Sequence, residues 1–81
     1  MNEVFLIGKI IEKVEYKFCL EKRKTAKARI KLELLDKTKL EVIAYNEIAD
    51  YCLQNLEYKD KVFINGKINT SEIECKYIEK L

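Results

Sequence analysis

Basic side chains gather in one stretch of the chain, where their spacing suits contact with a row of phosphates. The residues from Lys17 to Lys31 hold seven basic residues and one acid, so their net charge is +6, whereas the other 66 residues have a net charge of −4. A positive stripe on a mildly acidic body is typical of a polyanion-binding face. A solvated loop with lysine-rich flanks explains the charge equally well. The basic residues are Lys17, Lys22, Arg23, Lys24, Lys27, Arg29 and Lys31.

Side chains suited to catalysis or metal binding are scarce by comparison. The chain has no histidine and one serine, Ser71, and its three cysteines are far apart at Cys19, Cys52 and Cys75. A nucleophile needs a neighbouring base, and a structural zinc site needs closely spaced cysteine or histidine ligands. We therefore expect no enzyme activity, no metal and no cofactor. We expect the cysteines to be small buried or half-buried side chains.

Length and composition indicate a single globular domain. The 81 residues are 48% hydrophobic and 37% charged, which is typical of a soluble folded chain. No apolar run approaches the roughly 20 residues of a membrane-spanning helix, and no basic-then-apolar signal segment opens the chain. We expect one domain over residues 1–81 and a cytoplasmic location.

The motif Val-Phe-x-x-Gly-Lys-Ile occurs twice, at Val4–Ile10 and Val62–Ile68, and contains the only two glycines. Apolar residues alternate along both segments, which predicts strands. A glycine within a strand usually marks a bulge, a bend at a barrel corner or a close backbone approach. Two bent strands of this kind favour a curled sheet closed into a barrel.

The periodicity of apolar residues predicts five strands and one helix. The first strand is long and bends at Gly8, as expected if it serves two sides of a barrel. Asn46 is the expected N-cap of the helix. This order predicts an all-β fold with one short helix, namely a five-stranded Greek-key OB-fold barrel with the helix between strands three and four. The expected strands are 3–18, 26–35, 39–45, 61–69 and 72–79, and the expected helix is 47–56. The inward side of the first strand is Val4, Leu6, Ile10, Val14, Tyr16 and Phe18, and the apolar stripe of the helix is Ile48, Ala49, Cys52, Leu53 and Leu56.

Two stretches, Asn2–Ile10 and Val42–Ile68, resemble the sequence pattern of a known protein family. They include both glycines, an aromatic residue at Tyr45 where the third strand ends, and the pair Ile48-Ala49 in the helix. In these residues the chain resembles the bacterial single-stranded DNA-binding protein (SSB) family. The resemblance implies an OB-fold, binding of single-stranded DNA, a role in DNA replication, repair or recombination, and assembly into a homodimer or homotetramer.

The chain also departs from that family. It has no tryptophan, whereas family members place tryptophans on the binding face. The long hairpins that embrace DNA in the family are cut to a few residues here, and we expect no acidic C-terminal tail for recruiting replication proteins. The sequence therefore looks like a minimal, tail-less relative, from a mobile element or from the primosomal branch of the family.

The outward faces of strands two and three carry what single-strand binding requires, which is cations for phosphates and a flat ring for bases. On strand three, Ile43 and Tyr45 are expected to point outward. Two registers are open, with either Arg29 or Lys31 opposite Tyr45. We expect Tyr45 to stack on bases; the alternative is a ring packed at the barrel rim. The expected phosphate contacts are Lys27, Arg29, Lys31 and Lys39, with Lys22, Arg23 and Lys24 from the loop.

The outward side of strand one carries three large apolar residues, Phe5, Ile7 and Ile11, interleaved with lysines. This is more apolar surface than scattered exposure explains, so we expect a homo-oligomer contact there.

Two further functions remain open on the residues alone. An OB-fold also serves as a protein-interaction or scaffold module without DNA binding, and stacking with phosphate contacts does not by itself distinguish RNA from DNA.

Overall fold

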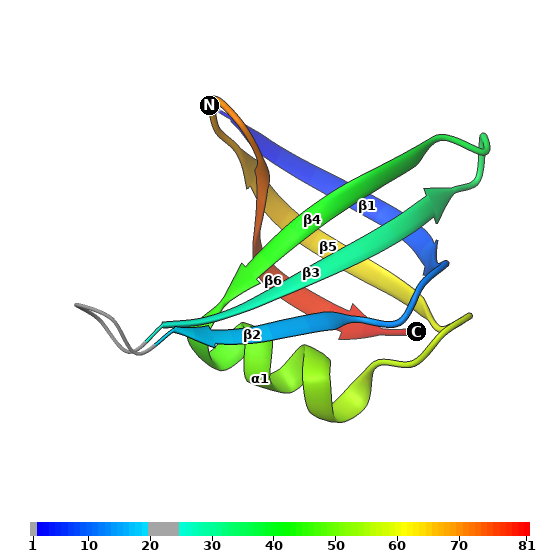
Figure 1. The fold of residues 1–81 in the computed structure, drawn as a ribbon. Helices are drawn as coiled ribbons and strands as arrows, with labels where there is room; N and C mark the ends of the chain where they lie inside the picture. Colours follow the sequence, from blue (N-terminus) through cyan, green and yellow to red (C-terminus); the bar gives the residue numbers. More distant parts are fainter. Residues whose placement is uncertain (1, 20–24) are drawn as a thin grey trace.

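The computed structural model describes residues 2–19 and 25–81, and within them it contains six strands and one helix (Figure 1). The elements in chain order are β1 (Glu3–Ile10), β2 (Glu15–Cys19), β3 (Thr25–Leu34), β4 (Lys39–Tyr45), α1 (Asn46–Asn55), β5 (Lys61–Ile68) and β6 (Ile73–Lys80). No helix in this part of the chain is long and apolar enough to cross a membrane.

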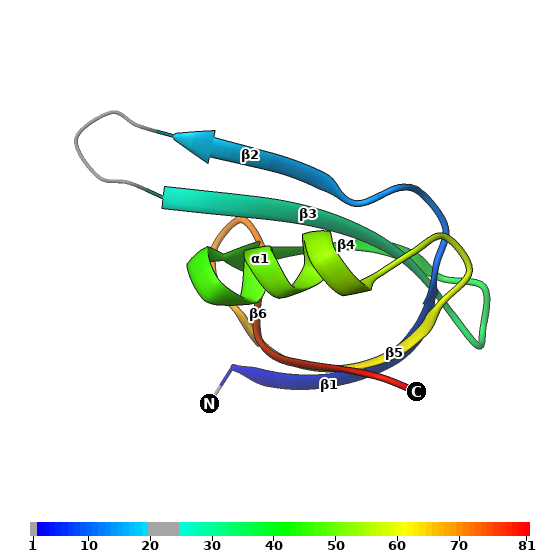
Figure 2. The ribbon, with the colours of Figure 1, turned by 90° about the horizontal axis from the view of Figure 1, so that it is seen from below.

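The strands form one sheet in the order β1-β5-β6-β4-β3-β2, and pairing of β1 with β3 closes it into a barrel. Figure 2 shows β2 and β3 on one side of the barrel and β1, β5 and β6 on the other, and Figure 1 shows α1 at one end. Together β1 and β2 take the place of the expected first strand. The predicted OB-fold, with its helix between the third and fourth strands of the barrel, is therefore confirmed.

The expected continuous first strand is wrong in one respect, because it is interrupted between Ile10 and Glu15. At the break, Ile10 N donates to Asp60 O beside β5, at 2.9 Å, and Ile11 N donates to Lys31 O of β3, at 3.1 Å. β1 pairs with β5 along its length, and its last residues also pair with β3, where Ile10 lies opposite Leu32. β2 continues along β3, with Glu15 opposite Arg29, so residues 11–14 lie opposite residues 30–31 alone, and this excess of residues interrupts the strand. The segment still serves two sides of the barrel, as expected, because β1 pairs with both β5 and β3, but it is divided into two strands.

Both glycines allow a close backbone approach, as the repeated motif predicts. A Cβ added at Gly66 would lie 2.9 Å from the backbone oxygen of Glu74, and one added at Gly8 would lie 3.1 Å from that of Glu33. Gly66 also lies at a register shift between β5 and β6. At both positions the lack of a side chain lets a neighbouring strand approach closely, β3 at Gly8 and β6 at Gly66.

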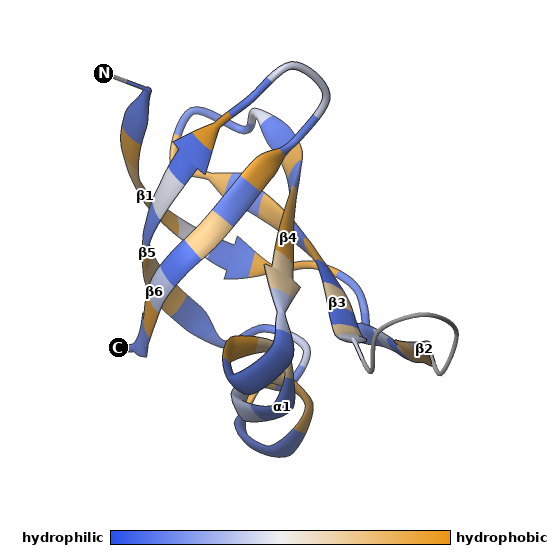
Figure 3. Ribbon diagram, turned by 90° about the vertical axis from the view of Figure 1, so that its left-hand side faces the viewer, coloured by the Kyte–Doolittle hydropathy of each residue, from blue (hydrophilic) through white to orange (hydrophobic). Residues whose placement is uncertain are grey.

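The core consists of one face of each strand and one side of α1. Hydrophilic and hydrophobic residues alternate along the strands (Figure 3), so the inner face is apolar. The largest fully buried side chains are Ile10, Ile30, Leu32, Ile64, Val42, Val62, Cys52 and Cys75. Burial raises the pKa of Cys52 to about 12 and that of Cys75 to about 11, so both thiols stay protonated near neutral pH.

Two predicted core positions are wrong, and one outward residue is buried. Leu53 of α1 and Phe18 of β2 are about half exposed, although the periodicity assigned both to the core. Ile43 of β4 lies outside the core cluster and opposite Arg29, on the outward side as expected, but it is buried there, with an exposed fraction of 4%. At this position β6 starts alongside β4 and pairs Glu74 with Ile43 in parallel, a neighbour that the local pattern does not indicate.

The start of α1 also differs from the prediction that Asn46 is its N-cap. Tyr45 occupies the cap position without a side-chain hydrogen bond, and α1 begins at Asn46, whose φ of 54° is left-handed. Asn46 Oδ1 instead accepts from Ala26 N–H at 3.2 Å. The chain turns directly from β4 into α1 here, which requires a left-handed residue, and asparagine tolerates that conformation. The hydrogen bond from Ala26 N–H to the Asn46 side chain connects this turn to β3.

Candidate nucleic-acid interface

The outward face of β2, β3 and β4 contains most of the expected binding residues, in a register that differs from both expected ones. Lys27, and neither Arg29 nor Lys31, lies opposite Tyr45. The β3–β4 turn is tighter than expected: Leu34 N donates to Thr38 O at 2.8 Å, and Lys37 adopts a left-handed φ of 73°. This register opposes Lys31 with Glu41 and Glu33 with Lys39, so each charge faces its opposite.

One row of residues across β2, β3 and β4 lacks such a pairing of opposite charges. Lys17 of β2 lies directly opposite Lys27 of β3, and Lys27 lies opposite Tyr45 of β4. Within residues 2–19 and 25–81, neither lysine has an acidic side chain within ion-pair distance. Like charges in directly opposed positions of a sheet are unfavourable, and a bound anion would remove that cost. We refer to Lys17, Lys27 and Tyr45 as the cationic row.

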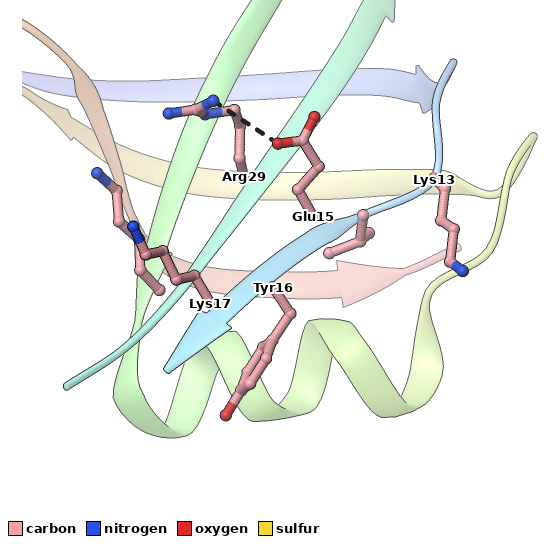
Figure 4. A pocket seen from close by; sticks show the side chains of 7 residues that line it. Lys13, Glu15, Tyr16, Lys17 and Arg29 are labelled. Carbon is pink, nitrogen blue, oxygen red and sulfur yellow. Dashed lines mark ion pairs between the residues drawn. The ribbon is translucent and has the colours of Figure 1, made fainter. Parts of the chain in front are cut away.

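Arg29 and Lys31, in contrast, are already paired. Arg29 Nη1 lies 3.7 Å from Glu15 Oε2, a contact that Figure 4 shows at the edge of the groove, and Arg29 Nε lies 3.2 Å from Glu41 Oε1. Lys31 Nζ lies 3.4 Å from Glu12 Oε1. All of these side chains are substantially exposed, so each pair contributes about 0–1 kcal/mol and could exchange its carboxylate for a phosphate.

The two lysines of the cationic row line an open groove of about 650 Å³ on the β2–β3 face (Figure 4). Its lining carries four cations and one carboxylate. The lining residues are Lys13, Val14, Glu15, Tyr16, Lys17, Lys27 and Arg29. Lys13 and Lys17 are absent from the residues expected to contact phosphates. Lys17 belongs to the basic stretch, but its position beside Lys27 follows only from the β2–β3 register.

Two tyrosines border this face, and each donates a hydrogen bond to a carboxylate. Tyr45, half-buried, donates through Oη to Glu72 Oε2 at 2.8 Å. Burial raises the pKa of Tyr45 to about 12, with further contributions from the hydrogen bond to Glu72 and from the charges of Glu72 and Glu74. Tyr16 donates to Asp50 Oδ1 at 2.6 Å, a bond that raises the pKa of Tyr16 and links β2 to α1.

The remaining expected binding residues are not brought together with the cationic row. Lys39 lies at the opposite end of β4 from Tyr45, about 20 Å along the strand. Lys22, Arg23 and Lys24 lie outside the described residues.

The expected oligomer contact lies on the opposite side of the barrel from the cationic row. Phe5 and Ile7 of β1 are 61% and 52% exposed, and Ile11 is partly buried just after β1. Phe5 stacks on Phe63 of β5 with 6.1 Å between ring centroids, and Phe63 meets Tyr77 of β6 edge to face at 6.4 Å. We refer to Phe5, Ile7, Phe63 and Tyr77 as the apolar patch.

Comparison with known proteins gives matches in structure alone. No protein-family model matches the chain, and no curated protein sequence matches it. Among solved structures, the SSB domain of a Synechococcus protein superimposes with a TM-score of 0.85 at 16% identity, covering 98% of this chain and 94% of that one. The wild-type single-stranded DNA binding protein from Thermus aquaticus gives a TM-score of 0.87 at 23% identity, covering all of this chain and 40% of that one. A deletion mutant of the Thermus protein gives 0.86 at 24% identity, with coverage of 100% and 41%.

The chain thus matches an isolated SSB domain over nearly its whole length and spans about 40% of the Thermus protein. At these identities the likeness establishes the backbone arrangement, which agrees with the strand order and helix position described above. The chain has the OB-fold of single-stranded DNA-binding protein domains.

Proposed function

We propose that this chain binds single-stranded DNA without reading a defined sequence, by phosphate contacts and base stacking on the β2–β3–β4 face. The observation that carries the proposal is the cationic row. Two lysines face one another without a compensating acid among the described residues, and an aromatic ring lies next to them in the same row. Phosphates need cations and bases need flat rings, and this row supplies both on the surface that OB-folds use for oligonucleotides.

In this proposal the DNA backbone follows the groove beside β2, where Lys17 and Lys27 contact phosphates. Arg29 joins them by exchanging its carboxylate partners for a phosphate, because exposed ion pairs cost little to break. A base stacks on the Tyr45 ring. Lys31 and Lys39 contribute less because both lie toward the other end of the hairpin, opposite carboxylates. The solved structures with the same fold include a protein named for single-stranded DNA binding, which supports the proposal. The proposal is of binding alone and includes no catalytic step.

We further propose that the protein acts as a homo-oligomer whose subunits meet through the apolar patch, with Ile11 at its margin. Large apolar side chains exposed in adjacent strands favour burial against a second copy. The patch lies across the barrel from the cationic row, so assembly leaves the DNA-binding face open (Figure 2). Light scattering at tens of micromolar should give a dimer or larger. A monomeric mass would contradict this part of the proposal.

Fluorescence-anisotropy titration with oligo-dT, oligo-rU and duplex DNA tests the proposed function. We expect oligo-dT to bind, duplex DNA to bind more weakly, and log K to fall with log salt concentration with a slope of roughly −2 to −4, for three to five phosphates neutralised per domain. Absence of binding at low salt, or affinity that ignores salt, would favour a protein-interaction module. Tighter binding of oligo-rU would favour RNA.

A further inference from the structure

Glu72 is held beside the proposed stacking ring by the turn between β5 and β6. Asn69 organises this turn, because its Oδ1 accepts from Ser71 N–H at 3.3 Å and from Glu72 N–H at 3.2 Å, while Asn69 N–H donates to Glu72 O at 3.0 Å. The Glu72 carboxylate then accepts from Tyr45 Oη at 2.8 Å. A segment distant in sequence thus brings a fixed acceptor to the edge of the Tyr45 ring.

Glu72 differs from its neighbour Glu74 in what balances its charge. Glu74 Oε2 lies 2.9 Å from Lys76 Nζ. Glu72 has no basic side chain within 4 Å among residues 2–19 and 25–81, and its one side-chain partner there is the Tyr45 hydroxyl, on Oε2. Its Oε1 atom therefore has the capacity to accept from a ligand.

The charges along this face fix how a nucleotide can lie on Tyr45. The face runs from Lys17 and Lys27 through the ring to the carboxylate of Glu72. A phosphate is attracted to the lysines and repelled by Glu72, so the base of a nucleotide stacked on the ring turns its hydrogen-bonding edge toward Glu72.

A carboxylate only accepts hydrogen bonds, so it distinguishes bases by their donors. Cytosine offers an amino group at position 4, whereas uracil and thymine offer a carbonyl oxygen there. The N3–H donor of uracil and thymine lies between two carbonyl oxygens, which repel a carboxylate. We propose that Glu72 is a specificity-determining residue that makes the Tyr45 position prefer cytosine to uracil or thymine. The proposal rests on the proposed function above, and it concerns a preference at one position of the bound strand.

Paired titrations with oligo-dC and oligo-dU of equal length, near neutral pH and at fixed salt, test this proposal. These two bases have nearly the same shape and differ at the hydrogen-bonding edge. We expect the parent protein to bind oligo-dC about three- to tenfold more tightly, the range expected for one hydrogen bond. Glu72→Gln should bring this ratio close to one, because an amide both donates and accepts while still accepting from Tyr45 Oη.

Glu74→Gln is the matched control, since it removes the same charge two residues away and should leave the ratio unchanged. A ratio of one in the parent, with both oligonucleotides bound, would overturn the base preference while the proposed function stands. Loss of the preference in both variants, or its retention in Glu72→Gln, would also overturn it. Binding of neither oligonucleotide would overturn the proposed function itself.

Discussion

The two ends of the β3–β4 hairpin carry similar residue types but differ in how their charges are paired. Near the turn, Lys31 faces Glu41 and Glu33 faces Lys39, so the charges are balanced within the sheet. At the other end, Lys27 faces Tyr45 on one side and Lys17 on the other, and the positive charges are not balanced by described neighbours. A surface built only for stability would pair its charges throughout. This difference supports the proposal that the Tyr45 end binds an anionic ligand.

Replacing the ring at the Tyr45 end should have the largest effect. Tyr45→Ala should cost about 1–3 kcal/mol of binding to oligo-dT, the range measured for a base stacked on an aromatic side chain. The salt slope should stay nearly unchanged, because stacking releases no counterions. Titrations at several salt concentrations measure both quantities.

Tyr45→Phe is the matched control, since it keeps the ring and removes only the hydrogen bond to Glu72. It should bind nearly as well as the parent. If Tyr45→Ala folds, as judged by circular dichroism, and binds as tightly as the parent, Tyr45 is not the stacking platform and its ring packs at the barrel rim.

Charge reversal should affect stability with opposite signs at the two ends. Lys27→Glu converts the like-charge pair with Lys17 into an opposite-charge pair, so the free energy of unfolding should rise by about 0.2–1 kcal/mol. Lys31→Glu places an acid opposite Glu41 and near Glu12, so it should lower that free energy by a similar amount. Urea unfolding of both variants measures these changes in the free energy of unfolding. Changes of the same sign in the two variants would show that the two ends do not differ in charge balance.

A smaller effect is expected where a carboxylate competes with DNA for Arg29. Glu41→Gln removes the nearer ion-pair partner of Arg29 and leaves the one at Glu15. We expect binding to oligo-dT to strengthen by a few tenths of a kcal/mol, up to about 1 kcal/mol, and to become more salt-dependent. Unchanged or weaker binding would mean that Arg29 does not contact phosphate.

The overall fold could be predicted from the sequence because its signals are local and repeated. The two copies of the glycine motif marked the positions where strands approach closely, and the change of period after Tyr45 marked the helix. The strand break after Ile10 was missed because residues 11–14 contain no glycine, proline or asparagine. It reflects a register shift against β3, from Ile10 opposite Leu32 to Glu15 opposite Arg29, and that register is a property of the closed barrel.

The site could be predicted in composition but not in arrangement. The hairpin register follows from the left-handed conformation of Lys37, and a lysine gives no sequence signal for such a turn. That register decides which cation lies beside Tyr45. Lys17 and Glu72 reach the site from β2 and from the β5–β6 turn, so their roles appear only once the barrel is closed.

The central claim is that the unbalanced end of the hairpin contacts phosphates, and the salt dependence of binding by two double variants tests it most directly. Lys17→Ala with Lys27→Ala removes the cations of the cationic row, and Lys31→Ala with Lys39→Ala removes the same charge from the balanced end. We predict that the first variant makes the salt slope for oligo-dT shallower by about 1.4, because two phosphates of the bound strand are no longer neutralised, and that the second changes it by much less. An equal change in both variants, or a larger change in the second, would contradict the account.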